Sequence, residues 1–257
     1  RVVTSAGGYP TFDFHVTGFG GTLDRVPYAA DRQDPAALVA RAAETGARMV
    51  YLCNPDNPMG GWHPPEVIEA AVAALPDDIL LILDEAYAEF APALPRIDPD
   101  DPRVLRMRTF SKAYGMAGAR IGWALGAPEV VRAFDRVRNH FGVNRIAQAG
   151  ALAALADGAH LAHVVDQVAA ARDRIAAIAR ENGLTPLPSA TNFVSLDCGG
   201  DGALARRVLE GLGARGVFVR MPWVAPQNRC IRVSCGPEAE LDAFAAALPE
   251  ALAAARG

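Results

Sequence analysis

Residues 49–60 read Met-Val-Tyr-Leu-Cys-Asn-Pro-Asp-Asn-Pro-Met-Gly, and residues 79–84 read Ile-Leu-Leu-Ile-Leu-Asp. Each stretch begins with five apolar or aromatic residues and then turns polar at once. A run this short and unbroken is typical of a strand that is buried on both faces of a sheet. The segment between them, residues 65–75, has a helical pattern, so together they predict a β–α–β unit in a parallel sheet.

The same alternation continues on both sides of this unit. Upstream, Asp34 and Pro35 are predicted to begin a helix as its N-cap and first residue. Downstream, we expect strands at 104–108, 121–125, 192–197, 217–220 and 231–234, and helices at 129–139, 146–156, 161–181, 204–212 and 239–254.

The fold class that this order predicts is α/β. We expect a large domain, residues 1–155, with a mostly parallel sheet flanked by helices. A smaller C-terminal α+β domain, residues 156–257, is expected to follow it.

Composition excludes several classes of protein. Of the 257 residues, 51% are hydrophobic and 21% charged, which is ordinary for a globular chain and unlike a disordered one. The net charge of −4 gives no sign of a basic surface that would bind nucleic acid. No apolar run is long enough to span a membrane. The four cysteines form no Cys-x-x-Cys pair, so we expect free thiols in a reducing compartment, the cytoplasm, and no metal site.

One residue type is almost absent. The chain has 25 basic residues, and Lys112 is the only lysine among them. Arginine supplies positive charge, but it stays protonated and cannot act as an amine nucleophile. A single lysine in an arginine-rich chain therefore suggests a position where an amine is chemically needed, although an arginine-rich composition alone also lowers the lysine count.

Polar residues follow three of the predicted strands. Asn54–Gly60 follows the first, Asp84 ends the second, and Thr109, Ser111 and Lys112 come directly after the third. Ligands of open α/β sheets bind beyond the carboxyl ends of the strands. We therefore expect these groups to meet in one site around the lysine. Read singly, each is also a common turn or helix-capping residue.

Four motifs resemble those of the fold-type I, pyridoxal-phosphate-dependent aminotransferases. Asn54–Gly60 is similar to the family's NPNNPTG signature, and Asp84–Tyr87 to its D-x-A-Y segment. Thr109–Arg120 resembles T-x-S-K-x-x-G-x-x-G-x-R, and Ile231–Ser234 resembles the late arginine motif. The motifs come in the family's order, and the match is strongest to the histidinol-phosphate aminotransferase-like branch. The resemblance implies pyridoxal 5'-phosphate as the cofactor and a homodimer.

The resemblance also implies roles for individual residues. Lys112 would bond to the cofactor aldehyde and carry the proton at the substrate α-carbon, with its pKa lowered by burial and by a nearby Arg120. Asp84 would pair with the pyridine nitrogen, with an N-cap as its alternative role. The remaining expected cofactor contacts are Asn57, Tyr87, Ser111, Thr109, Arg120 and Tyr9, and the expected substrate contacts are Arg232 and Asn192.

The chain departs from the family pattern in two places. Met59 stands where the family has threonine, and we expect a repacked loop there. The family also has a segment before the region of Tyr9 that supplies a phosphate-binding loop, part of the small domain and an arm to the partner subunit. This chain shows no counterpart, so we expect an N-terminal segment to be absent and the site to be incomplete without it.

Three functions are consistent with these residues. The first is an aminotransferase that moves an amino group from an L-amino acid, or from histidinol phosphate, to a 2-oxo acid such as 2-oxoglutarate. The second is a lyase or decarboxylase with the same site, which would not accumulate pyridoxamine phosphate. The third is a non-catalytic relative that holds the cofactor without turnover.

Overall fold

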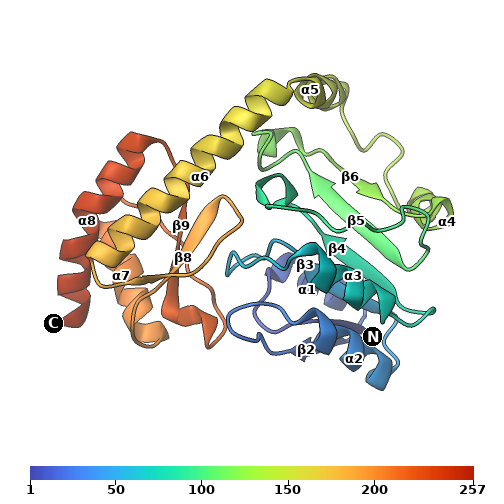
Figure 1. The fold of residues 1–257 in the computed structure, drawn as a ribbon, viewed down its shortest axis with the longest axis horizontal. Coiled ribbons are helices and arrows are strands. Elements are labelled where there is room, and N and C mark those ends of the chain that lie inside the picture. The colour runs from blue at the N-terminus through green and yellow to red at the C-terminus, as the bar shows by residue number, and fades with distance from the viewer.

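The computed structural model describes residues 1–257 and contains two sheets (Figure 1). The larger sheet has the strand order β2-β1-β3-β4-β5-β6. Its first five strands are parallel and only β6 is antiparallel, which confirms the predicted mostly parallel sheet. The strands are β1 Val2–Ser5, β2 Leu23–Val26, β3 Met49–Cys53, β4 Leu80–Asp84, β5 Val104–Thr109 and β6 Gly122–Leu125.

The two faces of the large sheet are covered by different helices. Helices α2 (Pro35–Thr45) and α3 (Pro65–Ala73) pack on one face, where Leu38 and Ile68 join strand residues such as Leu81 in one core. Asp34 caps α2 by accepting a hydrogen bond from the Ala37 amide at 3.0 Å, as predicted. Helix α1 (Pro10–Gly18) lies against the opposite face, where Phe12 stacks on Tyr51 of β3.

The second sheet is small and antiparallel, in the order β7-β8-β9. Its strands are β7 Thr185–Pro186, β8 Phe193–Asp197 and β9 Cys230–Ser234, and its helices are α7 Gly202–Ala214 and α8 Glu238–Arg256. These elements bury a core of their own together with the C-terminal half of α6 (Gly158–Glu181). The N-terminal half of α6 instead packs on Tyr87 and Phe90, so this one helix spans both parts of the molecule (Figure 1).

The predicted helix at 129–139 is wrong as one element. The structure has α4 (Pro128–Arg132) and a 3-10 turn, Ala133–Arg136, with no buried residue in either. Helices gain most of their stability from packing an apolar face, and this segment packs none. A regular helix resumes at α5 (Arg145–Ala156), where the side chain of Asn144 accepts a hydrogen bond from the Ala147 amide at 2.7 Å.

The predicted strand at 217–220 is also absent. Only Arg220 pairs with another strand residue, Arg232 of β9. The other short 3-10 turns are Ala88–Phe90, Ala117–Ala119 and Gln227–Arg229.

No helix combines the length and the apolar character needed to cross a membrane. All four cysteines are free.

Candidate active site

Lys112 lies on the loop that follows β5, close to residues from the end of β4. Its Nζ atom is 5.1 Å from the centre of the Tyr87 ring, and the lysine is half-buried. Parallel pairing of β4 with β5 brings the two carboxyl ends together, because Asp84 is in register with Met107. The sheet thus places a lysine, a tyrosine and a carboxylate at one edge.

Asp84 is held by donors but has no ion-pair partner in the structure. The Tyr51 hydroxyl donates to its Oδ2 atom at 2.6 Å, and the Ala86 amide donates to Oδ1 at 3.0 Å. Burial raises the pKa of the Asp84 carboxyl, and these hydrogen bonds together with Lys112 only partly oppose the rise. A half-buried carboxylate of this kind is suited to a cationic ring nitrogen.

Burial is the main cause that lowers the pKa of Lys112, and the cations Arg232 and Arg220 add to it. Tyr9 and Asp84 oppose the shift. The expectation that Arg120 supplies this cation is wrong. Arg120 is exposed, has a left-handed backbone with φ of 53°, and donates from Nη1 to the Ala117 carbonyl at 2.6 Å.

Asn57, Tyr87 and Arg232 meet opposite the lysine. The Asn57 Nδ2 atom donates to the Tyr87 hydroxyl at 3.4 Å, and Arg232 donates from Nη1 to the Asn57 Oδ1 atom. The Arg232 guanidinium also lies over the Phe193 ring, 4.7 Å from its centre. Arg232 reaches this position from β9, so the smaller sheet contributes a side chain to a site built on the larger one.

The other predicted site residues lie at different distances from this centre. The Thr109 hydroxyl accepts a hydrogen bond from the Ser111 amide at 3.0 Å, which shapes the turn that leads to Lys112. Tyr9 is 46% exposed and lies near enough to Lys112 to influence its pKa. Asn192 contributes its main chain, whose carbonyl accepts from the Cys235 amide at 2.9 Å. No side-chain contact joins Asn192 to the group around Lys112.

Sequence reasoning missed two residues of this site. Tyr51 holds Asp84, and its position in the predicted strand 49–53, on the face opposite Val50 and Leu52, is the signal that could have found it. Arg220 is brought in by backbone hydrogen bonds with Arg232 at 3.1 and 2.6 Å. No local pattern marks Arg220, because this pairing depends on the loop that connects the two segments.

The loop that begins at Asn54 is enclosed between the two sheets. The Ser195 hydroxyl donates to the Pro58 carbonyl at 2.7 Å, and the Ala190 amide donates to the Gly60 carbonyl at 2.9 Å. Met59 is buried, with 1% of its surface exposed, so an apolar side chain fills the position where the family pattern has a hydroxyl.

These residues fit pyridoxal phosphate. Lys112 offers an amine of lowered pKa, and Asp84 offers a half-buried carboxylate without an ion-pair partner. Asn57 and Tyr87 lie beside them as hydrogen-bonding groups, and Ser111, Thr109 and Arg120 are the groups nearest in sequence that could hold a phosphate. The fold and the site together define a fold-type I, pyridoxal-phosphate-dependent enzyme.

Comparisons with known proteins agree with this description. The family model for aminotransferase class I and II matches residues 1–248, and the chain belongs to that family. Histidinol-phosphate aminotransferase 1 of Mesorhizobium japonicum is 38% identical over 255 residues, which are 95% of this chain and 68% of that protein. An aromatic amino acid aminotransferase of Nocardia farcinica is 38% identical over 77% of this chain and 57% of its own length.

Solved structures are similar as well. The crystal structure of histidinol-phosphate aminotransferase from Sinorhizobium meliloti in complex with pyridoxal-5'-phosphate superposes with a TM-score of 0.95 and 56% identity. The match covers 98% of this chain and 70% of that one. The chain thus spans about two thirds of the length of the relatives that it matches most fully.

Proposed function

We propose that this protein transfers an amino group from an L-amino acid or a phosphorylated amine to a 2-oxo acid. The observation that carries the proposal is the position of the only lysine of the chain. Lys112 lies half-buried beside Tyr87, with its pKa lowered, in a site that also contains the half-buried carboxylate of Asp84.

The proposed roles follow from these positions. Pyridoxal phosphate, when bound, supplies an aldehyde and an electron-withdrawing ring. Lys112 Nζ would hold the aldehyde end of the cofactor and would move the proton at the substrate α-carbon, which requires a neutral amine. Asp84 would accept a hydrogen bond from the ring nitrogen, while Tyr51 holds the carboxylate in place. Asn57 and Tyr87 would donate hydrogen bonds to the ring oxygen.

Two arginines define the proposed substrate class. Arg232 and Arg220 are paired through their backbones, and both are near enough to Lys112 to lower its pKa. One guanidinium is enough for a carboxylate, while two suit the dianionic charge of a phosphate monoester. Since several relatives are named histidinol-phosphate aminotransferase, we propose histidinol phosphate as amino donor and 2-oxoglutarate as acceptor.

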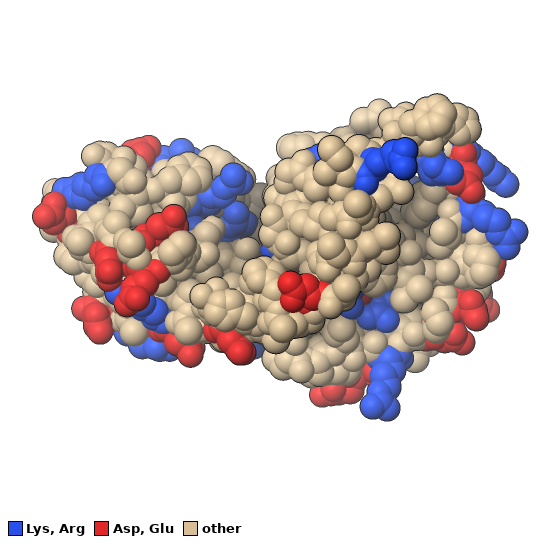
Figure 2. Space-filling model, turned by 90° about the horizontal axis from the view of Figure 1, so that it is seen from above, with Lys and Arg blue, Asp and Glu red and all other residues tan.

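We also propose a homodimer. Large apolar side chains are exposed on α1 and on residues 141–155, with Phe14 at 69%, Phe141 at 98% and Ile146 at 87% exposure. Figure 2, which looks down on α5, shows a broad area there with few charged side chains, and one acidic side chain lies at its lower edge. Contiguous exposed apolar surface is typical of a protein–protein interface. A second copy of the chain is the proposed partner.

The compartment and the domain boundary are proposals too. Four free cysteines without a disulfide suit a reducing compartment, for which we propose the cytoplasm. The separate cores of the two sheets support a large domain of residues 1–155 and a small domain of residues 156–257.

The experiment that tests the proposed function measures glutamate formed from 2-oxoglutarate with histidinol phosphate as donor. We expect turnover by the protein and a loss of about a thousandfold in kcat for Lys112→Ala, because the proton carrier is gone. Release of carbon dioxide or ammonia without glutamate would instead support a lyase. Binding of the cofactor without any product would support a non-catalytic relative.

A further inference from the structure

Asp56, the residue before Asn57, carries a buried carboxylate. Asp56 has 2% of its surface exposed and no ion-pair partner. Its Oδ1 atom accepts from the Tyr28 hydroxyl at 2.9 Å and from Gln33 Nε2 at 2.6 Å, and its Oδ2 atom accepts from the Met59 amide at 3.2 Å. Three donors therefore converge on one side chain.

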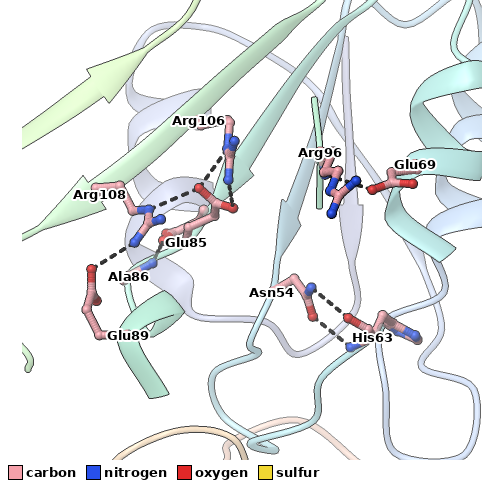
Figure 3. Close-up of polar contacts among 10 residues, drawn as sticks. Asn54, His63, Glu69, Glu85, Ala86, Glu89, Arg96, Arg106 and Arg108 are labelled. Atoms are coloured by element: carbon pink, nitrogen blue, oxygen red, sulfur yellow. Dashed lines mark hydrogen bonds and ion pairs between the residues drawn. The ribbon is translucent and has the colours of Figure 1, made fainter. Parts of the chain in front are cut away.

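The groups that surround Asp56 are themselves fixed. Gln33 Oε1 accepts from the Cys53 amide at 3.2 Å, at the end of β3, and the Gln33 carbonyl lies 2.6 Å from His63 Nε2. Asn54 and His63 exchange two hydrogen bonds, of 3.1 and 2.8 Å, which close the base of the loop (Figure 3). The carboxylate thus joins the turn of the loop to a rigid strand end.

The hydrogen bonds of Asp56 bear on the orientation of the next residue, Asn57. Its amide faces Tyr87 on one side and Arg232 on the other. Asp56 shares the tight turn with it, since the Asp56 amide donates to the Gly61 carbonyl at 2.7 Å and the Gly60 amide donates to the Asp56 carbonyl at 3.1 Å. A rotation of this turn would move Asn57 away from both partners.

A carboxylate suits this position better than a neutral side chain. Burial of a carboxylate without an ion-pair partner costs free energy, which by itself favours a neutral side chain. An asparagine, however, would place its own NH₂ group against one of the three donors. Hydrogen bonds to an ionised acceptor are also about twice as strong as neutral ones.

We propose that Asp56 is a positioning residue, whose carboxylate holds the loop through Tyr28 and Gln33 so that Asn57 presents its amide to the cofactor and to Arg232. The inference rests on the proposed function for its effect on turnover. Its effect on cofactor affinity does not depend on turnover.

The test is a double-mutant cycle between Asp56→Asn and Asn57→Ala, read first as the Kd for pyridoxal phosphate. Tryptophan fluorescence of the cofactor-free protein reports binding. We expect Asp56→Asn alone to raise the Kd about tenfold, because a hydrogen bond to the cofactor is misplaced. In the Asn57→Ala background the same change should raise it less than about twofold, since the amide that it positions is gone.

A buried carboxylate with a different role serves as the control. Glu85, the residue that follows Asp84, is ion-paired with Arg106 and Arg108 at 2.7 and 3.1 Å (Figure 3). Glu85→Gln should lower the melting temperature, and its effect on the Kd should be the same with and without Asn57. Tyr28→Phe serves as a second variant if Asp56→Asn does not fold, and should show the same dependence on Asn57 at smaller size.

Two results would overturn the proposal: an unchanged Kd in Asp56→Asn and Tyr28→Phe, or an increase of equal size in both backgrounds. The kcat/KM for amino transfer should follow the same pattern as the Kd. If the protein binds the cofactor but transfers no amino group, the proposed function fails while the Kd cycle still decides the role of Asp56.

Discussion

At the scale of single residues, burial disfavours the charged forms of two ionisable groups in the site, Lys112 and Asp84. It lowers the pKa of the Lys112 amine and raises that of the Asp84 carboxyl. A neutral amine is what the proposed proton transfer requires, and a cationic ring nitrogen would stabilise the charge of Asp84. Both shifts therefore agree with the proposed roles.

Arg232 offers a residue-scale prediction. Its guanidinium can bind an oxyanion through two parallel hydrogen bonds while stacked on Phe193, and an ammonium can do neither. We expect Arg232→Lys to raise the KM of both substrates about 10- to 100-fold, although the charge is conserved. Steady-state kinetics check this. An unchanged KM would show that Arg232 does not bind the substrate anion.

Asp56 offers a second prediction at this scale. Burial raises the pKa of its carboxyl to about 6, above the value of an unfolded aspartate. Stability from the protonated form is thus fully present below about pH 4 and is lost as the pH rises through 6. From pH 4 to pH 7, we expect the wild-type free energy of unfolding to fall by about 2 kcal/mol relative to Asp56→Asn. Urea unfolding of both proteins across this range checks it, and parallel pH profiles would contradict it.

At the scale of elements, the Asn54–Gly60 loop depends on close packing against the smaller sheet. Gly60 has φ of +84°, and a Cβ atom there would lie 2.8 Å from the Ser189 hydroxyl. The conformation and the contact both require glycine. The loop and the 189–195 segment are therefore fitted to each other.

We expect Gly60→Ala to destabilise the protein by about 1–3 kcal/mol, because strain and steric overlap add. It should also weaken cofactor binding through the loop. The matched control is Gly46→Ala, where φ is +62° but nothing lies within 4 Å of the added atom. Thermal unfolding and the cofactor Kd compare them. Equal losses in the two variants would show that the contact with Ser189 is unimportant.

Elements were predictable where their own residues decide them. The strands at 49–53 and 79–83 have continuous apolar runs, and the structure has them within one residue. Strand β1 and helix α1 were not predicted: β1 has four residues, and α1 buries none. The helix at 129–139 was overpredicted, because its residues favour a helix but have no surface to pack on.

The candidate site likewise contains residues that the sequence predicts and residues that only the tertiary fold brings in. The residues that the motifs single out, Lys112, Asp84, Asn57, Tyr87 and Arg232, lie close together in the structure, and their roles stay predictions. Arg120 was assigned as the neighbouring cation because it is near in sequence, but the turn before it directs its side chain to Ala117. Arg220 instead lies near Lys112, where that cation was expected. Its backbone pairs with that of Arg232, and only the tertiary fold creates this contact.

At the scale of the whole molecule, the two sheets are joined by a few polar contacts across the site. Arg229 binds Asp31 of the large part at 2.8 and 2.9 Å and Asp197 of the small part at 2.7 Å. Gln227 Nε2 donates to the Ala6 carbonyl at 3.0 Å. Together with Arg232, these contacts set how the smaller sheet covers the cofactor site.

The proposed dimer gives a prediction at this scale. Ile146 is 87% exposed on α5, so a charge there would be harmless in a monomer. If a second copy covers it, Ile146→Asp should weaken association at least about tenfold. Sedimentation velocity of both proteins measures this. A wild-type monomer, or a variant that associates equally well, would contradict the proposed interface.

The most direct test of the central claim is borohydride reduction of the protein saturated with pyridoxal phosphate, followed by peptide mapping. The chain has a single lysine, so the result is unambiguous. We predict one cofactor-labelled peptide, which contains Lys112, and no label in Lys112→Ala. A saturated protein that leaves Lys112 unlabelled would contradict the account.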